Sequence, residues 1–280
     1  AVPSEYPITA PTPPHVAADA GPNNIQVPSA EETKATPFVI FNASEPQLIK
    51  EEIMIELYEL AATDDKQVFS PYCWRIRLAL HHKGLPFKSI PWRMTEKDRI
   101  AFAETERVPV LVDGEQKLVD SWKILEYLDE RYPAPSLEMN RAELRFFRHW
   151  TEMVMFPGMI RMIVDEIHKT VHEKDRDYFQ ATREKTFGMP LEEFAANKEA
   201  KLEEFRKSLN PLRATLKAFD FLGGSQPNLA DYLVFSGLMW ARCTSPMPLL
   251  AEEDSVFAWR ERMLDLFDDM ARSIPCREMN

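Results

Sequence analysis

Cysteine and glycine are scarce in this sequence, and long apolar runs are absent. The three cysteines (Cys73, Cys243 and Cys276) are too few for a disulfide framework and do not follow metal-ligand spacing. The sequence therefore predicts a chain from a reducing compartment, without a metal. With eight glycines and no glycine-rich phosphate loop, it also predicts no nucleotide cofactor.

No stretch of about 18 apolar residues is present to span a membrane as a helix. The first residues lack the basic and apolar segments of a secretory signal, so we expect a cytoplasmic protein. The chain carries 34 basic and 45 acidic residues, a net charge of −11. This acidic balance argues against nucleic acid or anionic membranes as main partners. At 280 residues and 45% hydrophobic composition, the chain can bury one large core or two modest ones.

Proline dominates the first segment, residues 1–50. Nine prolines lie between Pro3 and Pro46. Because proline lacks a backbone donor and fixes φ, this segment cannot form a regular element. We expect an extended arm, disordered or draped over the body, with the apolar run at 38–41 as its anchor.

Residues 51–135 alternate between strand and helix patterns. Apolar, β-forming runs predict strands at 53–60, 87–92, 108–113 and 118–120. Ser70 and Pro71 open a helix that Gly84 ends, a second helical region covers 96–103, and Ser121 caps a third. This βαβ, helix, ββα order predicts a thioredoxin-like α/β domain. A proline at Pro109 cannot donate to a sheet, so we expect a cis bond there.

Residues 136–280 read as helical throughout, which predicts an all-α second domain. Asn228 followed by Asp231 is a variant of the capping box, a reciprocal helix-start motif. The expected helices cover 137–170, 175–186, 191–219, 229–241 and 251–273.

Several short motifs stand in a characteristic order. They are Ser-Pro-Tyr-Cys-Trp-Arg at 70–75, Glu-Arg-Val-Pro-Val at 106–110, Asp-Ser-Trp at 120–122, Glu-Tyr-Leu-Asp at 126–129 and Arg-Glu-Lys-Thr-Phe-Gly at 183–188. With them, the chain from about residue 53 onward resembles the glutathione transferase superfamily, in particular its etherase-related branch of bacteria and fungi. The resemblance implies the cytosolic glutathione transferase fold, glutathione as co-substrate, a small hydrophobic or aromatic electrophile as acceptor, and a homodimer.

The resemblance implies that Ser70 is the catalytic residue. A helix N-terminus carries unpaired N–H groups and a partial positive charge, so a serine there can help hold the glutathione sulfur as a thiolate. The alternative is that Ser70 serves only as an N-cap. Because serine rather than cysteine stands at this position, dithiol exchange lacks its attacking sulfur, and Cys73 is expected to be a packing residue.

The resemblance implies four further contacts to glutathione. The main chain of Val108, before the cis proline Pro109, pairs with the peptide backbone, and Asp120 binds the ammonium group. Ser121, at a helix start, binds the γ-glutamyl carboxylate, and either Arg93 or Arg107 binds the glycine carboxylate. The superfamily often has glutamate where this chain has Asp120. Alternatively, Pro109 is an edge-strand proline and Ser121 a bare N-cap.

We expect the acceptor to bind between the two domains, in a cleft suited to flat apolar or phenolic ligands. Aromatic residues near Ser70 and a run at near-helical spacing on the first long helix are its candidate walls. Each could equally be a core residue. The candidates are Tyr72, Trp74, Trp150, Met153, Phe156, Met159 and Trp240.

The resemblance implies an enzyme that conjugates glutathione to an electrophile or uses it to cleave a β-aryl ether, in detoxification or in secondary metabolism. A carrier that keeps the fold and binds polyphenols or pigments without turnover is the alternative. A third reading is an interaction module in which the proline-rich arm docks a partner.

Overall fold

The computed structural model of this protein describes residues 54–278, which belong to one compact unit. The arm expected at residues 1–50, with its apolar run at 38–41, lies outside the described residues.

A four-stranded mixed sheet forms the first part of the described chain, with strand order β2-β1-β3-β4. Strand β1 (Ile55–Leu60) runs parallel to β2 (Phe87–Trp92). It runs antiparallel to β3 (Val110–Asp113), which pairs in turn with β4 (Gln116–Val119). Buried residues alternate along β1, because successive side chains of a strand point to opposite faces.

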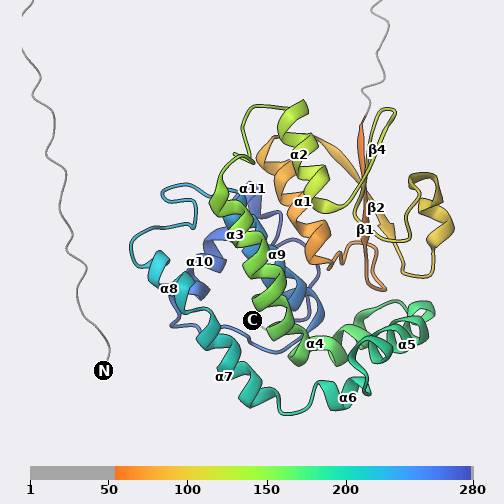
Figure 1. Ribbon diagram of the computed structural model, residues 1–280, viewed down its shortest axis with the longest axis vertical. Coiled ribbons are helices and arrows are strands. Elements are labelled where there is room, and N and C mark those ends of the chain that lie inside the picture. The colour runs from red at the N-terminus through yellow and green to blue at the C-terminus, as the bar shows by residue number, and fades with distance from the viewer. Residues whose placement is uncertain (1–53, 279–280) are drawn as a thin grey trace, which may run out of the picture. The chain divides into compact units, whose positions relative to one another are not determined.

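Helices cover both faces of this sheet. Helices α1 (Pro71–His82) and α2 (Ser121–Arg131) lie on one side, and the 3-10 segment η1 (Lys97–Ala103) lies on the other (Figure 1). The predicted thioredoxin-like arrangement is therefore confirmed, and so is the cis bond between Val108 and Pro109. One detail was wrong: Asp120 rather than Ser121 caps α2, because its carboxylate accepts the amides of Trp122 and Lys123.

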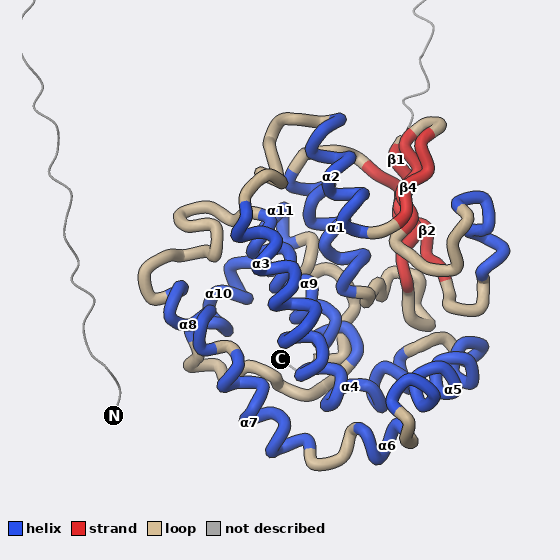
Figure 2. The backbone as a smooth tube through the Cα atoms, viewed as in Figure 1, coloured by secondary structure: helices blue, strands red, loops and turns tan. Residues whose placement is uncertain are grey.

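The rest of the described chain is helical, as predicted, and Figure 2 shows the strands confined to one side. Its elements are α3 (Ala142–Trp150), the π-helical turn η2 (Thr151–Met155), α4 (Phe156–Thr170), η3 (Glu173–Asp175), α5 (Arg176–Phe187), α6 (Leu191–Phe194), α7 (Lys198–Ser208), α8 (Asn210–Leu216), α9 (Leu229–Thr244), α10 (Ser255–Leu264) and α11 (Leu266–Asp269). No helix among residues 54–278 is both long enough and apolar enough to cross a membrane.

Three of the helices predicted from the sequence are longer than the helices in the structure. The helix expected at 137–170 begins at Ala142 and contains the π-helical turn. The one expected at 191–219 is broken where Asn197 takes a left-handed conformation (φ 56°) and again at α8, which has a proline in its first turn. The one expected at 251–273 is interrupted by left-handed backbone at Phe267 and Asp268.

Helix α9 forms the centre of the core and packs against both α1 and α4. Its predicted start motif is confirmed. The Asn228 side chain accepts the amide of Ala230 at 2.9 Å, and the Asp231 carboxylate accepts the amide of Asn228 at 3.0 Å. The buried indole of Trp259 donates to the same Asp231 carboxylate at 2.8 Å. Because one core extends through both predicted domains, it holds the sheet and the helical part together.

Candidate functional site

Ser70 stands at the N-terminus of α1, where the chain arrives from β1. Its carbonyl accepts the amides of Cys73 at 3.1 Å and Trp74 at 2.9 Å, which starts the helix. Its side chain makes no capping hydrogen bond. Pro71 follows in the first helical turn, where its missing N–H costs nothing.

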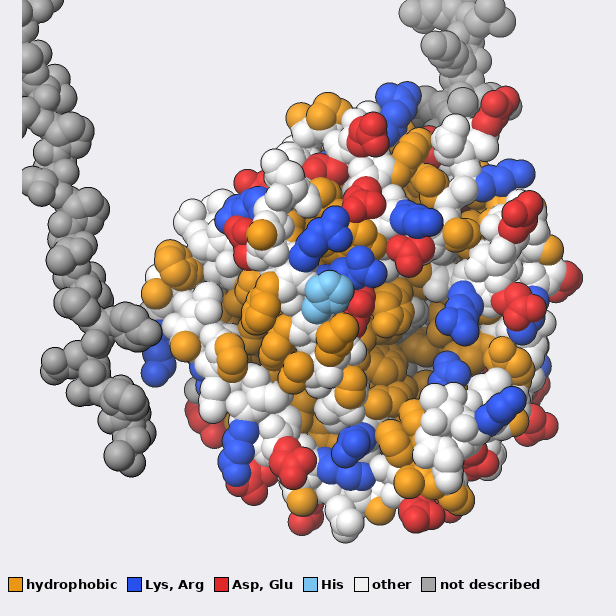
Figure 3. Space-filling view, in the orientation of Figure 1, with side chains coloured by type: hydrophobic (Ala, Val, Ile, Leu, Met, Phe, Trp, Pro, Cys, Tyr) orange, Lys and Arg blue, Asp and Glu red, His pale blue; other side chains and the backbone are white. Residues whose placement is uncertain are grey.

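Two adjoining cavities meet at Ser70, one of about 600 Å³ and one of about 550 Å³. Both are bordered by Leu60, Ser70, Tyr72, Met94, Arg183 and Thr186. Figure 3 shows a recess lined with hydrophobic side chains, in the region between the sheet and α5. A molecule in one cavity and a molecule in the other would therefore both reach Ser70.

The larger cavity, here called the polar cavity, lies toward β3 and the cis proline. Val108, Arg107 and Glu106 border it on the sheet side, and Lys185 borders it from α5. Glu106 is neutralised by an ion pair with Lys97. Among residues 54–278, Arg107 and Lys185 form no ion pair, so the cavity has an excess of positive charge that suits a carboxylate.

The smaller cavity, here called the apolar cavity, is walled by aromatic side chains. The ring of Phe156 meets that of Tyr72 edge-on at 5.9 Å and that of Trp240 edge-on at 5.7 Å. Phe187 and Phe194 stack at 3.8 Å in another part of the wall. Phe69 and Phe179 complete the aromatic lining. Such a wall favours flat, apolar ligands.

Tyr72 borders both cavities and is 39% exposed. The guanidinium of Arg75 lies 4.8 Å from its ring centroid and is held by Glu152 at 2.8 Å. Burial raises the pKa of Tyr72, so its hydroxyl is neutral at neutral pH and can donate a hydrogen bond.

The Cys73 thiol is unreactive at neutral pH. It is fully buried on α1, and burial raises its pKa to about 12. Almost no thiolate is therefore present at neutral pH, which agrees with its expected packing role. Across the described part of the chain, no group of three or more His, Cys, Asp or Glu residues is placed to hold a metal ion.

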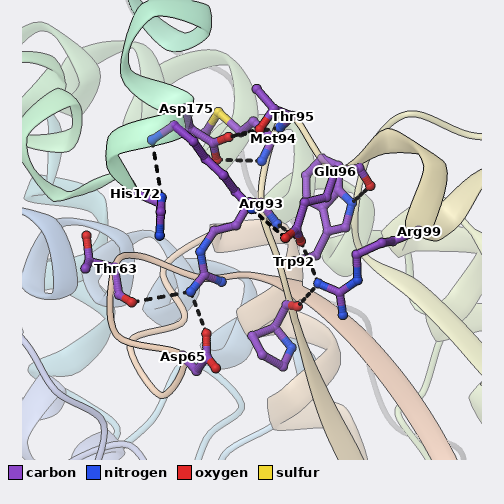
Figure 4. A network of polar contacts seen from close by, with 12 residues as sticks. Thr63, Asp65, Trp92, Arg93, Met94, Thr95, Glu96, Arg99, His172 and Asp175 are labelled. Carbon is purple, nitrogen blue, oxygen red and sulfur yellow. Dashed lines mark hydrogen bonds and ion pairs between the residues drawn. The ribbon is translucent and has the colours of Figure 1, made fainter.

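Arg93, one of the two candidates for the glycine carboxylate, is paired with other groups of the protein. It is buried, and its guanidinium reaches the Asp65 carboxylate at 2.5 Å and the Thr63 carbonyl at 3.4 Å (Figure 4). The charge of Arg93 is already paired and Arg93 borders neither cavity, whereas Arg107 borders the polar one, so we favour Arg107 for this role.

The loop after β2 is instead tied to the start of α5. The buried carboxylate of Asp175 accepts the amide of Met94 at 2.6 Å, the amide of Thr95 at 3.0 Å and the hydroxyl of Thr95 at 2.6 Å (Figure 4). Lys174 also binds Glu96 at 2.6 Å. Since Met94 borders both cavities and α5 supplies part of their walls, these contacts hold the two sides of the site together.

Asp120 and Ser121 stand at the start of α2 and border neither cavity. Asp120 Oδ1 is occupied by the cap, accepting amides at 2.9 and 3.1 Å. Its Oδ2 makes no hydrogen bond within residues 54–278, and the side chain is exposed. Their roles toward the γ-glutamyl end stay predictions.

Of the seven residues expected to hold the acceptor, Tyr72, Phe156 and Trp240 border the apolar cavity, and the other four do not. Trp74 is fully buried and donates its indole N–H to the Val68 carbonyl at 3.0 Å. Met159 is fully buried as well, whereas Met153 is 70% exposed. Trp150 is half-buried against the core.

The expected wall assumed 3.6 residues per turn from Trp150 to Met159. The structure instead has the π-helical turn η2 between Trp150 and Phe156. Met153, within this turn, is exposed, while Phe156, which follows it, borders the apolar cavity.

Helix α5 supplies site residues to which the sequence assigned no role. Phe179, Arg183 and Thr186 follow one another at spacings of four and three, which places them on one helix face. That face borders the cavities. The spacing was visible in the sequence, but nothing in it indicated which side of α5 would meet the sheet domain.

Comparison with known families matches both halves of the described chain. The family described as "Glutathione S-transferase, N-terminal domain" matches residues 67–136. The family described as "Glutathione S-transferase, C-terminal domain" matches residues 142–264.

Curated relatives match at different lengths. The glutathione S-transferase-like protein ustS of Aspergillus flavus is 23% identical over 68% of this chain and 81% of its own. Glutathione S-transferase Z1 of Arabidopsis thaliana is 40% identical, over only 30% of this chain and 41% of its own.

Solved structures share the fold. Glutathione S-transferase CsGST63524 of Ceriporiopsis subvermispora, solved in complex with glutathione, superposes with a TM-score of 0.66 at 20% identity, over 78% of this chain and 97% of its own. Glutathione transferase GSTFuA3 of Phanerochaete chrysosporium gives a TM-score of 0.62 at 22% identity, over 79% of this chain and 94% of its own. With both domain families matched in order and this fold, the chain belongs to the glutathione S-transferase superfamily.

Proposed function

We propose that this protein is a glutathione transferase that binds the tripeptide in the polar cavity and its acceptor in the apolar cavity. The observation that carries the proposal is the position of Ser70 at the junction of the two cavities, at a helix N-terminus, with a hydroxyl that caps nothing. A sulfur at this point would face both the hydroxyl and the acceptor.

The polar cavity matches the chemistry of the tripeptide. Glutathione carries two carboxylates and one ammonium, so it is a net anion. Arg107 is the proposed partner of the glycine carboxylate, and Val108, before the cis proline, offers main-chain groups to the peptide. Asp120 and Ser121 are the proposed partners of the γ-glutamyl end.

Ser70 would donate its hydroxyl hydrogen to the sulfur, and the α1 dipole would favour the anion, so that the thiol releases its proton to solvent. The thiolate then forms a bond to an electrophilic carbon of the acceptor. The group displaced from that carbon leaves with the bonding electron pair, as chloride from an aryl halide or as a phenolate from a β-aryl ether. When an epoxide opens, the oxygen takes up a proton from solvent.

The test compares Ser70→Ala with the wild type, using glutathione affinity by calorimetry and turnover of a panel of aryl halides, epoxides and β-aryl ethers. We expect kcat to fall by about 10²- to 10³-fold while the glutathione Kd stays within about threefold. The thiol of bound glutathione should ionise at higher pH in the variant.

Cys73→Ala is the control, because its thiol is buried and protonated; it should keep the wild-type ionisation of bound glutathione. An equal loss of kcat and affinity in Ser70→Ala would assign the hydroxyl to binding alone. Glutathione binding without turnover of any member of the panel would favour the carrier. The homodimer implied by the resemblance stays a prediction.

A further inference from the structure

The charges that line the apolar cavity are unbalanced. Its one lining carboxylate among the described residues, Glu152, is paired with Arg75 at 2.8 Å and Arg148 at 3.5 Å. The other two charged residues that line it are Arg161 and Arg183, and neither forms an ion pair with any residue in 54–278. An otherwise apolar cavity in a protein of net charge −11 thus carries two cations without counterions.

Arg183 is the more buried of these two cations. Its guanidinium carbon lies 5.0 Å from the centroid of the Phe179 ring, and the hydrogen bond from Nη1 to Thr182 Oγ1 is long, at 3.3 Å. Burial lowers the pKa of Arg183; the nearby Tyr178 acts to raise it, and the positive charge of Arg107 acts to lower it. A cation removed from water without a partner is costly, so an anion placed beside it would relieve that cost.

Arg183 lies where the two cavities meet. The Phe179 ring beneath its guanidinium borders only the apolar cavity, whereas Thr182, to which Nη1 donates, borders only the polar one. The polar cavity already has Arg107 and Lys185 for the carboxylate of the tripeptide. The anion that Arg183 faces is therefore better supplied by the second substrate than by glutathione.

We propose that Arg183 is a specificity-determining residue that selects acceptors carrying a carboxylate on an aromatic ring. The edge-on aromatic set of Tyr72, Phe156 and Trp240 would hold the ring, and Arg183 would form a charged hydrogen bond with the carboxylate. This inference rests on the proposed transferase function and adds the chemical class of the acceptor.

Two probes, one an anion and the other its neutral methyl ester, test the inference: 4-chloro-3-nitrobenzoate and methyl 4-chloro-3-nitrobenzoate. In both, the glutathione thiolate forms a C–S bond at the ring carbon and chloride leaves with the electron pair of the C–Cl bond. Each kcat/KM is divided by the rate constant of the uncatalysed reaction, because the ester is intrinsically more reactive. We expect the wild type to prefer the acid by about 10- to 100-fold, the size of one charged hydrogen bond.

Arg183→Met should abolish that preference, lowering kcat/KM for the acid and leaving the ester and the glutathione KM within about twofold. Arg183→Lys keeps the positive charge and should retain part of the preference for the acid. This variant keeps the test valid if Arg183→Met does not fold. Arg176→Met is the matched control, since Arg176 is an exposed arginine on the same helix that borders neither cavity. It should behave as the wild type.

Binding of the two conjugates, S-(4-carboxy-2-nitrophenyl)glutathione and its methyl ester, gives a readout that needs no catalysis. Tighter binding of the acid by the wild type, lost in Arg183→Met, supports the inference. Equal binding of both conjugates overturns it while leaving the transferase function intact. A rise in the glutathione KM with an unchanged acid preference also overturns it, because Arg183 would then bind the tripeptide. Failure of both conjugates to bind overturns the proposed function as well.

Discussion

Gly237 on α9 lies against the ring of Phe156 on α4. A Cβ added to the glycine would stand 2.7 Å from Phe156 Cε1 and 3.1 Å from Met155 Cε. Contacts this short require a shift, and Phe156 is a rigid ring that also borders the apolar cavity. The absence of a side chain at Gly237 therefore sets the position of one wall of the proposed acceptor site.

We expect Gly237→Ala to push Phe156 into the apolar cavity. Alanine favours a helix by about 1 kcal/mol, but overpacking costs about 1–3 kcal/mol, so the net effect on unfolding free energy should be a small loss. The kcat/KM for an aromatic acceptor should fall on the order of tenfold through misplacement, with glutathione affinity unchanged. Gly158→Ala, whose added Cβ would meet Phe205 at 3.4 Å, is the control and should preserve acceptor kinetics.

Asp175→Ala should loosen the link between α5 and the loop after β2. Its buried carboxylate accepts three hydrogen bonds from Met94 and Thr95, so we expect a loss of about 2–4 kcal/mol in unfolding free energy, measured by urea titration. The KM values for both substrates should rise together, since Met94 borders both cavities. Asp177→Ala, a change at an exposed position in the first turn of α5, should alter neither quantity. Unchanged KM values in Asp175→Ala would show that the link serves stability alone.

The contribution of Glu96 to the unfolding free energy should be lost at acidic pH. Burial acts to raise its pKa, but hydrogen bonds from Lys174, Arg99 and the Arg93 amide outweigh this effect, and the pKa lies below the usual value. A carboxyl whose folded pKa is lowered stabilises the protein above its unfolded pKa of about 4.3 and loses that contribution as pH falls through the folded pKa.

The difference in unfolding free energy between the wild type and Glu96→Gln should therefore be largest near pH 7. It should shrink below about pH 4.3, as followed by urea titration at each pH. Glu173→Gln, at an exposed position whose side chain makes no hydrogen bond or ion pair within residues 54–278, should follow the wild-type profile. A difference that stays constant with pH would mean that the charge of Glu96 contributes nothing.

Features that depend on neighbouring residues could be read from the sequence. Ser70 with Pro71 predicted the start of α1, apolar runs of β-forming residues predicted the strands, and the order of elements predicted the thioredoxin-like arrangement. Asn228 and Asp231 predicted the start of α9. In each case the relevant interactions lie within a few residues along the chain, so a local pattern contains the needed information.

Predictions made from the local sequence pattern failed where a side chain had competing partners far away in the chain. The local sequence does not show which arginine has a carboxylate partner. In the structure Arg93 is paired with Asp65, and Arg183 has no carboxylate partner within residues 54–278. The sequence also contained no sign of the π-helical turn η2 within the long helix.

Amino-acid order thus specified the helix N-terminus, the cis proline and the two-part architecture, because backbone geometry and capping act over short range. Which cations stay free, and which aromatic rings line the cavities, followed from the packing of α4, α5 and α9 around the sheet domain. Those outcomes depend on contacts between segments that are distant in the chain, and no local pattern encodes them.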